Sequence, residues 1–486
     1  MQIVIPAAGK GSRLGNLTKE NTKGMLEVNG ESLISRTLKN ISFLEVERII
    51  IIIGFEGENL KKYLGDNYHG TPILYIWNHD YETTNNIYSI FLAQDEIIKD
   101  DSIFIESDLI FDENLLKDLN DCPYKNLVVA DHFESWMDGT VIVADNNLNI
   151  SSFVSREDIE MQKINKYYKT VNIYKFSKDF LQNTYFPLVS MYINAGNLSE
   201  YYETPLKLVP LIKFDGLKIF NASPYDWYEI DDLQDLDMAS LLFSNNDNLS
   251  YELTAKRYGG YWRFPKVLDY CYLVNPHFPP QQMKDEMKSN FDSLIGSYPS
   301  ALFIQNMLAS RMFNVDPEYL IVGNGGTELI NEMGRYFGSS FHLLTPTFKE
   351  YEKRFKNVTH TQVNQENINE ASSNFLKNHN GSEGLILVNP DNPTGQFIQK
   401  DDMIKFVEKN SNAPIIIDES FMDFADPNIR YTLIDQDLMS KHKNIFVLKS
   451  IGKSYGVGGL RLGVLISGDI KAINEIGKGL PIWNIN

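Results

Sequence analysis

Two glycines and two cations near the start of the chain mark a loop suited to phosphate. The run "IVIPAAGKGSRLG" places Gly9 and Gly11 directly after a short apolar stretch, with Arg13 close behind and Lys23 further along. Glycines lack Cβ atoms, so backbone N–H groups can approach phosphate oxygens, and a guanidinium can bind two such oxygens at once. Leu14 stands where a dinucleotide fingerprint needs its third glycine, and a P-loop ending is absent. The loop predicts a triphosphate site of another kind, the alternative being an ordinary strand-to-helix turn.

Two carboxylates far apart in the chain are candidate ligands for a magnesium ion. Asp108 ends the apolar run "SIFIESD", and Asp231 follows "WYEI" just before a helical pattern. An Mg²⁺ ion that bridges nucleotide phosphates is commonly held by one or two such carboxylates. Asp108 as a turn residue and Asp231 as a helix cap are the alternatives. The neighbouring acidic residues are further candidate ligands: Glu106, Glu229 and Asp232.

These features resemble the sugar-phosphate and choline-phosphate nucleotidyltransferase family over most of residues 1 to 240. The likeness is carried by "AAGKGSRL … TKGMLEVNG", in which Thr22 replaces the family's proline before Lys23. A second stretch, "NHDYETTNNIYSIFLA", is similar to CTP:phosphocholine cytidylyltransferases. The resemblance implies that an acceptor oxygen attacks the α-phosphorus of the nucleotide while Arg13, Lys23 and Mg²⁺ neutralise charge. The nucleotide-binding residues that it implies are Ala7, Ala8, Gly9, Gly11, Ser12, Arg13, Lys23, Asn86 and Ser89.

Three residues are candidates for binding the acceptor. The nearer resemblance is to enzymes whose acceptor carries a cationic amine. It implies that "HFESWMDG" offers Trp136 for a cation–π contact and Asp138 for an ion pair. Lys169, in "YYKTVNIY", is a candidate for the acceptor's phosphorus group. A buried tryptophan, a turn aspartate and a surface lysine are the alternative interpretations.

The run "SIGKSYGVGGLRLG" resembles the S-x-x-K…R-x-G pattern of class I and II aminotransferases. The resemblance implies that Lys453 forms the Schiff base with pyridoxal phosphate and that Ser450 and Arg461 hold its phosphate. Residues at the start of a helix in "VGNGGTELI" form a natural anion site. These further phosphate ligands are Gly325, Gly326 and Thr327.

Other pieces of the same resemblance follow in the family's order. Phe348 would stack on the pyridine ring, Asn392 would bind the cofactor's O3′, and Asp418 would keep the pyridine nitrogen protonated. Many relatives carry a tyrosine where this chain has Phe421. Tyr298, in "SYPS", resembles a residue that reaches the phosphate of a neighbouring subunit, which implies a homodimer. A core tyrosine before a proline turn is the alternative.

The elements that position these residues follow a pattern of short apolar strands alternating with helical stretches. This pattern predicts an α/β chain of two domains. We expect a Rossmann-like nucleotidyltransferase domain with a mixed sheet at residues 1–244 and a polar linker at 245–260. Residues 261–486 are expected to form the large domain of a fold-type I pyridoxal-phosphate aminotransferase. Since the chain stops soon after Arg461, we expect this domain to be incomplete, without the usual C-terminal small domain.

Charge and composition exclude several classes of partner. The formal net charge of −19 argues against binding to nucleic acid or to an anionic membrane, because both need a basic face. The two cysteines lack metal-site spacing, and no signal peptide or membrane span is evident at the start. We therefore expect a cytoplasmic protein whose thiols are reduced.

Taken together, the two halves resemble bifunctional phosphonate cytidylyltransferase–transaminase proteins. This resemblance implies that a transaminase forms 2-aminoethylphosphonate from phosphonoacetaldehyde and that CTP converts it to the CMP derivative. The alternative acceptors are phosphocholine and phosphoethanolamine, with the second domain acting as a decarboxylase or as an inactive dimerising platform.

Overall fold

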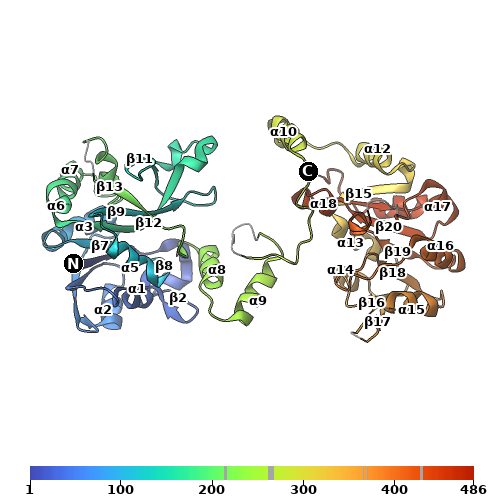
Figure 1. The fold of residues 1–486 in the computed structure, drawn as a ribbon, viewed down its shortest axis with the longest axis horizontal. Helices are drawn as coiled ribbons and strands as arrows, with labels where there is room; N and C mark the ends of the chain where they lie inside the picture. Colours follow the sequence, from blue (N-terminus) through green and yellow to red (C-terminus); the bar gives the residue numbers. More distant parts are fainter. Residues whose placement is uncertain (213–215, 261–266, 365, 369, 427–430, 486) are drawn as a thin grey trace. The chain divides into compact units, whose positions relative to one another are not determined.

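The computed structural model describes residues 1–486 apart from 213–215, 261–266, 365, 369, 427–430 and 486, and apart from the side chains of Ser12 and Asn16. Contacts divide the chain into two compact units, Met1–Gly260 and Tyr261–Asn486. Each unit is an α/β domain built on a mixed sheet, drawn in Figure 1, which confirms the predicted fold class. The stretch 245–260, expected to be a linker, contains helix α9 (Asp247–Arg257), which Asn246 caps.

The first unit is built on a ten-stranded sheet with a parallel centre. Its order is β11-β10-β12-β7-β1-β4-β6-β5, and β9 lies between β12 and β13. Strand β1 runs parallel to β4 and β7, whereas β12 runs antiparallel to β7, β9 and β10. The strands are β1 (Gln2–Ala7), β4 (Arg48–Ile53), β5 (Asn67–Tyr68), β6 (Thr71–Trp77), β7 (Ser102–Ile105), β9 (Asn126–His132), β10 (Val141–Ala144), β11 (Ile150–Val154), β12 (Tyr167–Phe176) and β13 (Leu217–Asn221).

Helices cover both faces of this sheet because alternate strand residues point to opposite sides. Ile3 and Ile5 of β1 pack with α1 (Leu33–Ile41), α2 (Gly57–Leu64) and α5 (Glu113–Asp121). Val4 packs on the other face with α3 (Asn86–Leu92), α4 (Gln94–Ile97), α6 (Lys178–Phe180) and α7 (Phe186–Asn194). The central strands are therefore buried on both sides, and their carboxyl ends form one edge where loops gather.

Two local irregularities shape that edge. A short antiparallel ladder pairs β8 (Leu109–Phe111) with β14 (Trp227–Glu229), and the Ile230 N–H donates to the Asp108 carbonyl oxygen at 3.1 Å. The ladder brings two distant chain segments together just before α8 (Leu233–Leu242). Strand β12 leaves its regular register between Thr170 and Tyr174, and Asn172 adopts a left-handed φ of 61°. Such bulges turn side chains toward a site.

The second unit is a seven-stranded sheet of order β15-β21-β20-β19-β18-β16-β17, in which β21 runs antiparallel to both neighbours. Helices α13 (Gly326–Tyr336), α14 (Glu350–Arg354) and α19 (Ile470–Gly477) pack on one face, and α15 (Ala371–Asn378), α16 (Lys400–Lys409) and α17 (Gln436–Lys441) on the other. The strands are β15 (Leu320–Asn324), β16 (Phe341–Thr345), β17 (Val358–Gln362), β18 (Gly384–Val388), β19 (Ile415–Asp418), β20 (Ile445–Ser450) and β21 (Leu462–Ile466).

Three further helices precede this sheet, and a short one follows β20. They are α10 (Gln281–Ser289), α11 (Phe291–Gly296), α12 (Leu302–Phe313) and α18 (Ile451–Ser454). Many large apolar side chains of α12 face solvent, Phe303 and Leu308 among them. Within the described residues, we find no helix with both the length and the apolar character needed to span a bilayer.

Candidate active sites

A cavity of about 260 Å³ opens at the carboxyl ends of β1 and β7 in the first unit. The loop after β1, the start of α3 and the segment after β7 contribute its walls. The lining residues are Pro6, Ala8, Gly9, Gly11, Arg13, Lys23, Asn78, Tyr81, Thr84, Asn85, Asn86, Ser89, Glu106, Ser107, Asp108 and Asp231. The structure thus brings most of the residues predicted to bind nucleotide and metal to one cavity.

The glycine loop is shaped by close contacts at two positions. Gly11 has a left-handed φ of 62°, and a Cβ atom there would lie 3.4 Å from the Lys23 Cβ. The Phe55 N–H donates to the Ala8 carbonyl oxygen at 3.1 Å and holds the loop against the end of β4. Ala7 is buried at the end of β1, and the side chain of Ser12 lies outside the described residues. The loop therefore runs along the cavity with Lys23 beside it.

Lys23 lies between the two predicted metal ligands. Its Nζ is 2.5 Å from Asp108 Oδ2 and 2.6 Å from Asp231 Oδ1, and Arg13 Nη1 is 2.9 Å from Asp231 Oδ2. Although burial opposes the charge, the two carboxylates raise the pKa of Lys23 well above its usual value. Burial likewise opposes the charge on Asp231, but Lys23 and Arg13 lower its pKa. The positive charges of Lys23 and Arg13 thus offset the negative charges of Asp108 and Asp231.

The donor set at this point fits a divalent metal ion. Asp108, Glu229 and Asp231 each offer a carboxylate oxygen, and these oxygens lie within 4.8 Å of one another. Asp108 Oδ1 is buried and has no hydrogen-bond partner among the residues that the structure describes. Mg²⁺ prefers oxygen ligands and commonly takes one or two carboxylates from the protein, which Asp108 and Asp231 can supply. The fit extends the predicted pair to Glu229, which was a predicted alternative.

The helix α3 residues predicted to bind nucleotide already have protein partners. Asn86 Nδ2 donates to Glu106 Oε1 at 3.3 Å, and Asn86 Oδ1 accepts from the Tyr202 N–H at 2.9 Å. Ser89 is buried and accepts from Asn78 Nδ2 at 2.9 Å. Asn85 caps the helix. Asn86 and Ser89 both line the cavity, and their hydrogen bonds to the protein hold this wall in place.

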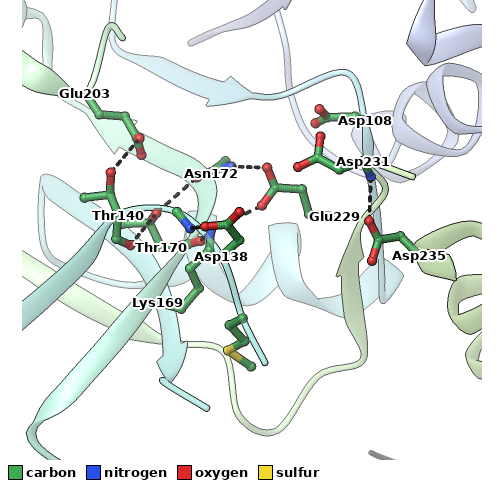
Figure 2. Close-up of polar contacts among 12 residues, drawn as sticks. Asp108, Asp138, Thr140, Lys169, Thr170, Asn172, Glu203, Glu229, Asp231 and Asp235 are labelled. Atoms are coloured by element: carbon green, nitrogen blue, oxygen red, sulfur yellow. Dashed lines mark hydrogen bonds and ion pairs between the residues drawn. The ribbon is translucent and has the colours of Figure 1, made fainter. Parts of the chain in front are cut away.

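Next to the cavity lies a group of three carboxylates, Glu106, Glu203 and Glu229, which we call the acidic chamber. Burial raises the pKa of all three, that of Glu229 to about 7, and the mutual repulsion of Glu106 with Asp108, Glu203 and Glu229 adds to the shift of Glu106. Glu203 accepts hydrogen bonds from Tyr174 and, at 3.3 Å, from Thr140 Oγ1. Figure 2 shows Glu203 and Glu229 reaching toward the same region from different segments. Burial thus disfavours the charged forms of these three carboxyl groups.

Lys169 and Asn172 of β12 bind one wall of this chamber (Figure 2), and Asn172 lies in the irregular part of the strand. Lys169 is buried, and its Nζ donates to the Thr170 carbonyl oxygen at 2.6 Å and to Glu229 Oε2 at 3.2 Å. Asn172 Nδ2 donates to Glu229 Oε1 at 3.0 Å. Lys169 is thus a buried partner of Glu229, and the alternative of a surface lysine is wrong.

The two residues predicted to bind an amine lie on the loop after β9. Trp136 stacks on Tyr228 with ring centroids 5.8 Å apart, and its Nε1 donates to Glu134. Asp138 is exposed and pairs with Arg156 at 2.8 Å. The carboxylate of Asp138 is therefore already paired with a neighbour, as that of Glu229 is with Lys169.

In the second unit, Lys453 lies in an aromatic pocket at the carboxyl edge of the sheet. Its Nζ is 4.2 Å from the ring centre of Phe421 and 5.7 Å from that of Phe348. Burial, reinforced by Arg461, lowers the pKa of Lys453 despite the nearby Asp418. A lowered pKa favours the neutral amine that attacks a carbonyl group.

Asp418 ends β19 with a buried carboxylate that is held at both oxygens. Tyr351 donates from its hydroxyl to Asp418 Oδ2 at 2.9 Å, and the Ser420 N–H donates to Oδ1 at 2.9 Å. Burial and Asp418 raise the pKa of Tyr351 well above its ordinary value, so the phenol keeps its proton. The carboxylate is thus fixed in one orientation.

Gly325 and Arg461 meet at the start of α13. A Cβ atom on Gly325, whose φ is 81°, would lie 2.5 Å from Arg461 Nη2. Gly326 and Thr327 are the first residues of α13, whose N-terminus favours an anion. Ser450 ends β20, and Asn392 is half-buried in the loop after β18. Only glycine at position 325 leaves room for the Arg461 guanidinium at this helix N-terminus. Together with Lys453 and Asp418, these residues fit pyridoxal phosphate.

The ring contact of Tyr298 is with none of these cofactor-site residues. Its ring is exposed and stacks on Trp483, with centroids 4.4 Å apart. The alternative interpretation of Tyr298 as a core tyrosine is therefore wrong for this chain.

Sequence reasoning missed Glu203, Asn172 and Tyr351. Glu203 follows two tyrosines in "YYETPLK", and no spacing links it to the phosphate loop. Asn172 stands inside what the sequence shows as a plain strand. Tyr351 follows Phe348 by three residues in "TFKEY", a spacing that puts both on one side of a helical turn. Of these three residues, Tyr351 is therefore the one whose place beside the site the sequence could have indicated.

Comparisons with known proteins agree with this division of the chain. Residues 3–147 match the MobA-like NTP transferase domain family, and residues 269–480 match aminotransferase class I and II. Over 500 residues the chain is 30% identical to the CMP-5'-(3-aminopropyl)phosphonate synthase of Streptomyces rubellomurinus, covering 100% of this chain and 77% of the synthase. It is 32% identical over 237 residues to an L-serine phosphate decarboxylase of Campylobacter jejuni, covering 45% of this chain and 59% of that relative.

Among solved structures, the CTP:phosphocholine cytidylyltransferase of Streptococcus pneumoniae has 20% identity and a TM-score of 0.43, covering 50% of this chain and 99% of that one. The full-length match joins both domains in one relative. The protein is thus an enzyme with a nucleotidyltransferase domain and a class I and II aminotransferase domain, and it belongs to the family of fused proteins that includes the Streptomyces synthase.

Proposed function

We propose that this chain is a cytoplasmic, bifunctional enzyme that activates a small amine-bearing phosphonate with CTP. A phosphonate oxygen of the acceptor forms a bond to the α-phosphorus of CTP, and the bond to pyrophosphate breaks. The first candidate acceptor is 2-aminoethylphosphonate, and 3-aminopropylphosphonate is the second because of the name of the Streptomyces relative. The products are the CMP-aminoalkylphosphonate, whose two phosphorus atoms share a bridging oxygen, and pyrophosphate.

In this reaction the chain positions reactants and balances charge. The N–H groups of the Gly9–Gly11 loop, with Arg13 and Lys23, bind the triphosphate, and Asn86 and Ser89 form the wall beside it. Asp108 and Asp231, with Glu229 next to them, would hold Mg²⁺, which neutralises phosphate charge when bound.

The observation that carries the choice of acceptor is the acidic chamber. Glu106 lines both the cavity and the chamber, so a phosphonate at the cavity can extend its amine toward Glu106, Glu203 and Glu229. Burial raises the pKa of Glu203 and Glu229, and a bound ammonium group would favour the charged forms of these carboxyl groups. Trp136 would offer an aromatic face to the amine, Lys169 holds Glu229 in place, and Asp138 would pair with the amine in place of Arg156.

We propose that the second domain supplies this acceptor with the help of pyridoxal phosphate, which provides an electron sink when bound. Lys453 would hold the cofactor covalently, Asp418 would keep a proton on its ring nitrogen, and Phe348 would stack on its ring. Its phosphate and O3′ would be held by Gly325, Gly326, Thr327, Ser450, Arg461 and Asn392, with Tyr298 of a second copy completing the site of a homodimer. The reaction proposed is transamination of phosphonoacetaldehyde to 2-aminoethylphosphonate.

A second candidate is favoured by the likeness to an L-serine phosphate decarboxylase. In that case the domain would remove carbon dioxide from an amino-acid phosphate or phosphonate, and the acceptor would be an amine-bearing product such as phosphoethanolamine.

A pyrophosphate-release screen tests the first domain. It crosses CTP, ATP, GTP and UTP with 2-aminoethylphosphonate, 3-aminopropylphosphonate, phosphocholine, phosphoethanolamine and sugar 1-phosphates. We expect release with CTP and an aminoalkylphosphonate, and release only with a sugar 1-phosphate would refute the proposal.

For the second domain, each candidate substrate is added to the cofactor-loaded protein. Formation of 2-aminoethylphosphonate from phosphonoacetaldehyde and an amino donor supports transamination. Carbon dioxide release from an amino-acid phosphate, with no amine transfer, supports the second candidate. A Lys453→Ala variant is the control, because it must abolish either activity.

A further inference from the structure

Lys23 occupies the position that the candidate metal ion needs. We propose that Lys23 is a built-in counter-ion that keeps divalent metal out of the site until a nucleotide triphosphate draws its ammonium group away, so that metal and nucleotide bind together. This inference rests on the proposed function for the identity of the nucleotide. The competition between lysine and metal can be measured without any acceptor.

The carboxylate oxygens at this site are almost fully engaged. Lys23 Nζ contacts Asp108 Oδ2 at 2.5 Å and Asp231 Oδ1 at 2.6 Å, and Arg13 takes Asp231 Oδ2 at 2.9 Å. Of the four oxygens of these two aspartates, the one without a hydrogen-bond partner among the described residues is Asp108 Oδ1. Two of the oxygens that a metal would need therefore already bind an ammonium group.

An ammonium group and a metal ion cannot share these oxygens. Mg²⁺ binds at about 2.0–2.1 Å, closer than the lysine does, and would place two cations within direct repulsive contact. The side chain of Lys23 is only 14% exposed, so solvent screens this repulsion weakly. Metal can enter only as Lys23 moves.

The triphosphate loop gives Lys23 a place to go. A Cβ atom on Gly11 would lie 3.4 Å from both Cβ and Cγ of Lys23, so the stem of the lysine runs along the loop. Rotation about its outer bonds can carry Nζ from the aspartates toward phosphate oxygens held by that loop. The released aspartates then face the metal that accompanies the nucleotide.

The test is a titration with Mn²⁺, followed by electron paramagnetic resonance, of the wild-type chain, Lys23→Met and Lys163→Met. Lys163 is an exposed lysine paired with Glu160, so its variant controls for the loss of one positive charge. Without nucleotide, we expect Lys23→Met to bind Mn²⁺ at least about tenfold more tightly than wild type, and Lys163→Met to match wild type. With CTP present, the wild-type affinity should rise by at least about tenfold, and that of Lys23→Met should rise less.

An Mn²⁺ affinity of Lys23→Met that is within about twofold of wild type, or weaker, overturns the proposal. Circular dichroism checks folding, and Lys23→Gln provides a second variant if the methionine does not fold. Adding Asp108→Asn to Lys23→Met should abolish the gain, because the tight site must include this carboxylate. If no acceptor yields pyrophosphate but the Mn²⁺ pattern appears, the proposed function fails and this inference stands.

Discussion

Replacing Glu203 by glutamine separates recognition of the amine from the rest of the reaction. The substitution keeps the shape of the side chain and removes one charge from the acidic chamber. Tyr174 and Thr140 donate to different oxygens of Glu203, so the amide keeps one oxygen as an acceptor for one of these two partners. We therefore expect the fold to persist while the acceptor's ammonium group loses one carboxylate partner.

The size of the effect follows from charge and burial. A carboxylate and an ammonium about 4 Å apart interact by about 4 kcal/mol at the effective dielectric of a protein surface. Desolvation of the amine offsets part of this, and hydrogen bonds to charged groups contribute about 1.5–3 kcal/mol net. Because Glu203 is half-buried, we take about 2 kcal/mol, which is about a 30-fold loss in kcat/KM.

The assay compares 2-aminoethylphosphonate with n-propylphosphonate, which has the same shape without the charge. Wild type should prefer the amine, and Glu203→Gln should lose about 30-fold with the amine while keeping its rate with the propyl compound. Glu200→Gln is the matched control, since Glu200 lies in the same segment and its carboxylate accepts from Thr204 Oγ1. Equal losses with both acceptors would refute the assignment, because they would report damage to the site and not recognition of charge.

Three other predictions concern single contacts. Tyr351→Phe removes the donor to Asp418 and should weaken pyridoxal phosphate binding by about 1–2 kcal/mol, measured by absorbance titration; unchanged affinity would contradict it. Gly325→Ala places a Cβ against Arg461 at a φ of 81° and should lower both thermal stability and cofactor affinity. A variant with wild-type stability and cofactor content would contradict this. Burial raises the pKa of Glu229 to about 7, so the folded state binds more protons than the unfolded state, and stability should fall as pH rises from about 5 to about 7. Glu229→Gln should flatten that fall by on the order of 1 kcal/mol in denaturant melts, and an unchanged slope would count against it.

Much of the fold was readable from local patterns. The stretches "QIVIPAA", "RIIIIIGF" and "SIFIESD" form β1, β4 and β7, because apolar runs of this length suit strands buried on both faces. The loop glycines, Asp108 and Asp231 fall at strand ends, where parallel sheets gather ligand groups. A phosphate loop and carboxylates at strand ends are encoded in short segments, so a single sequence can indicate them.

The acidic chamber was not readable in the same way. Glu106, Glu203 and Glu229 come from three segments, and Lys169 and the irregular Asn172 of β12 both bind Glu229. Nothing in the spacing of these residues marks them as neighbours, because their proximity depends on how β12, β14 and the segment after α7 meet. The pairing of Asp138 with Arg156 is also invisible in the sequence, since both residues look like ordinary loop charges.

The sequence by itself determined the two α/β domains, the phosphate loop and the lysine pattern of the second domain, because strand periodicity and short motifs are local properties of the chain. Only the tertiary structure decided the charge balance: which carboxylates are compensated, which are not, and that Lys23 lies between Asp108 and Asp231. Electrostatic energies depend on distance and burial in three dimensions, so residues more than a hundred positions apart can set each other's charge state.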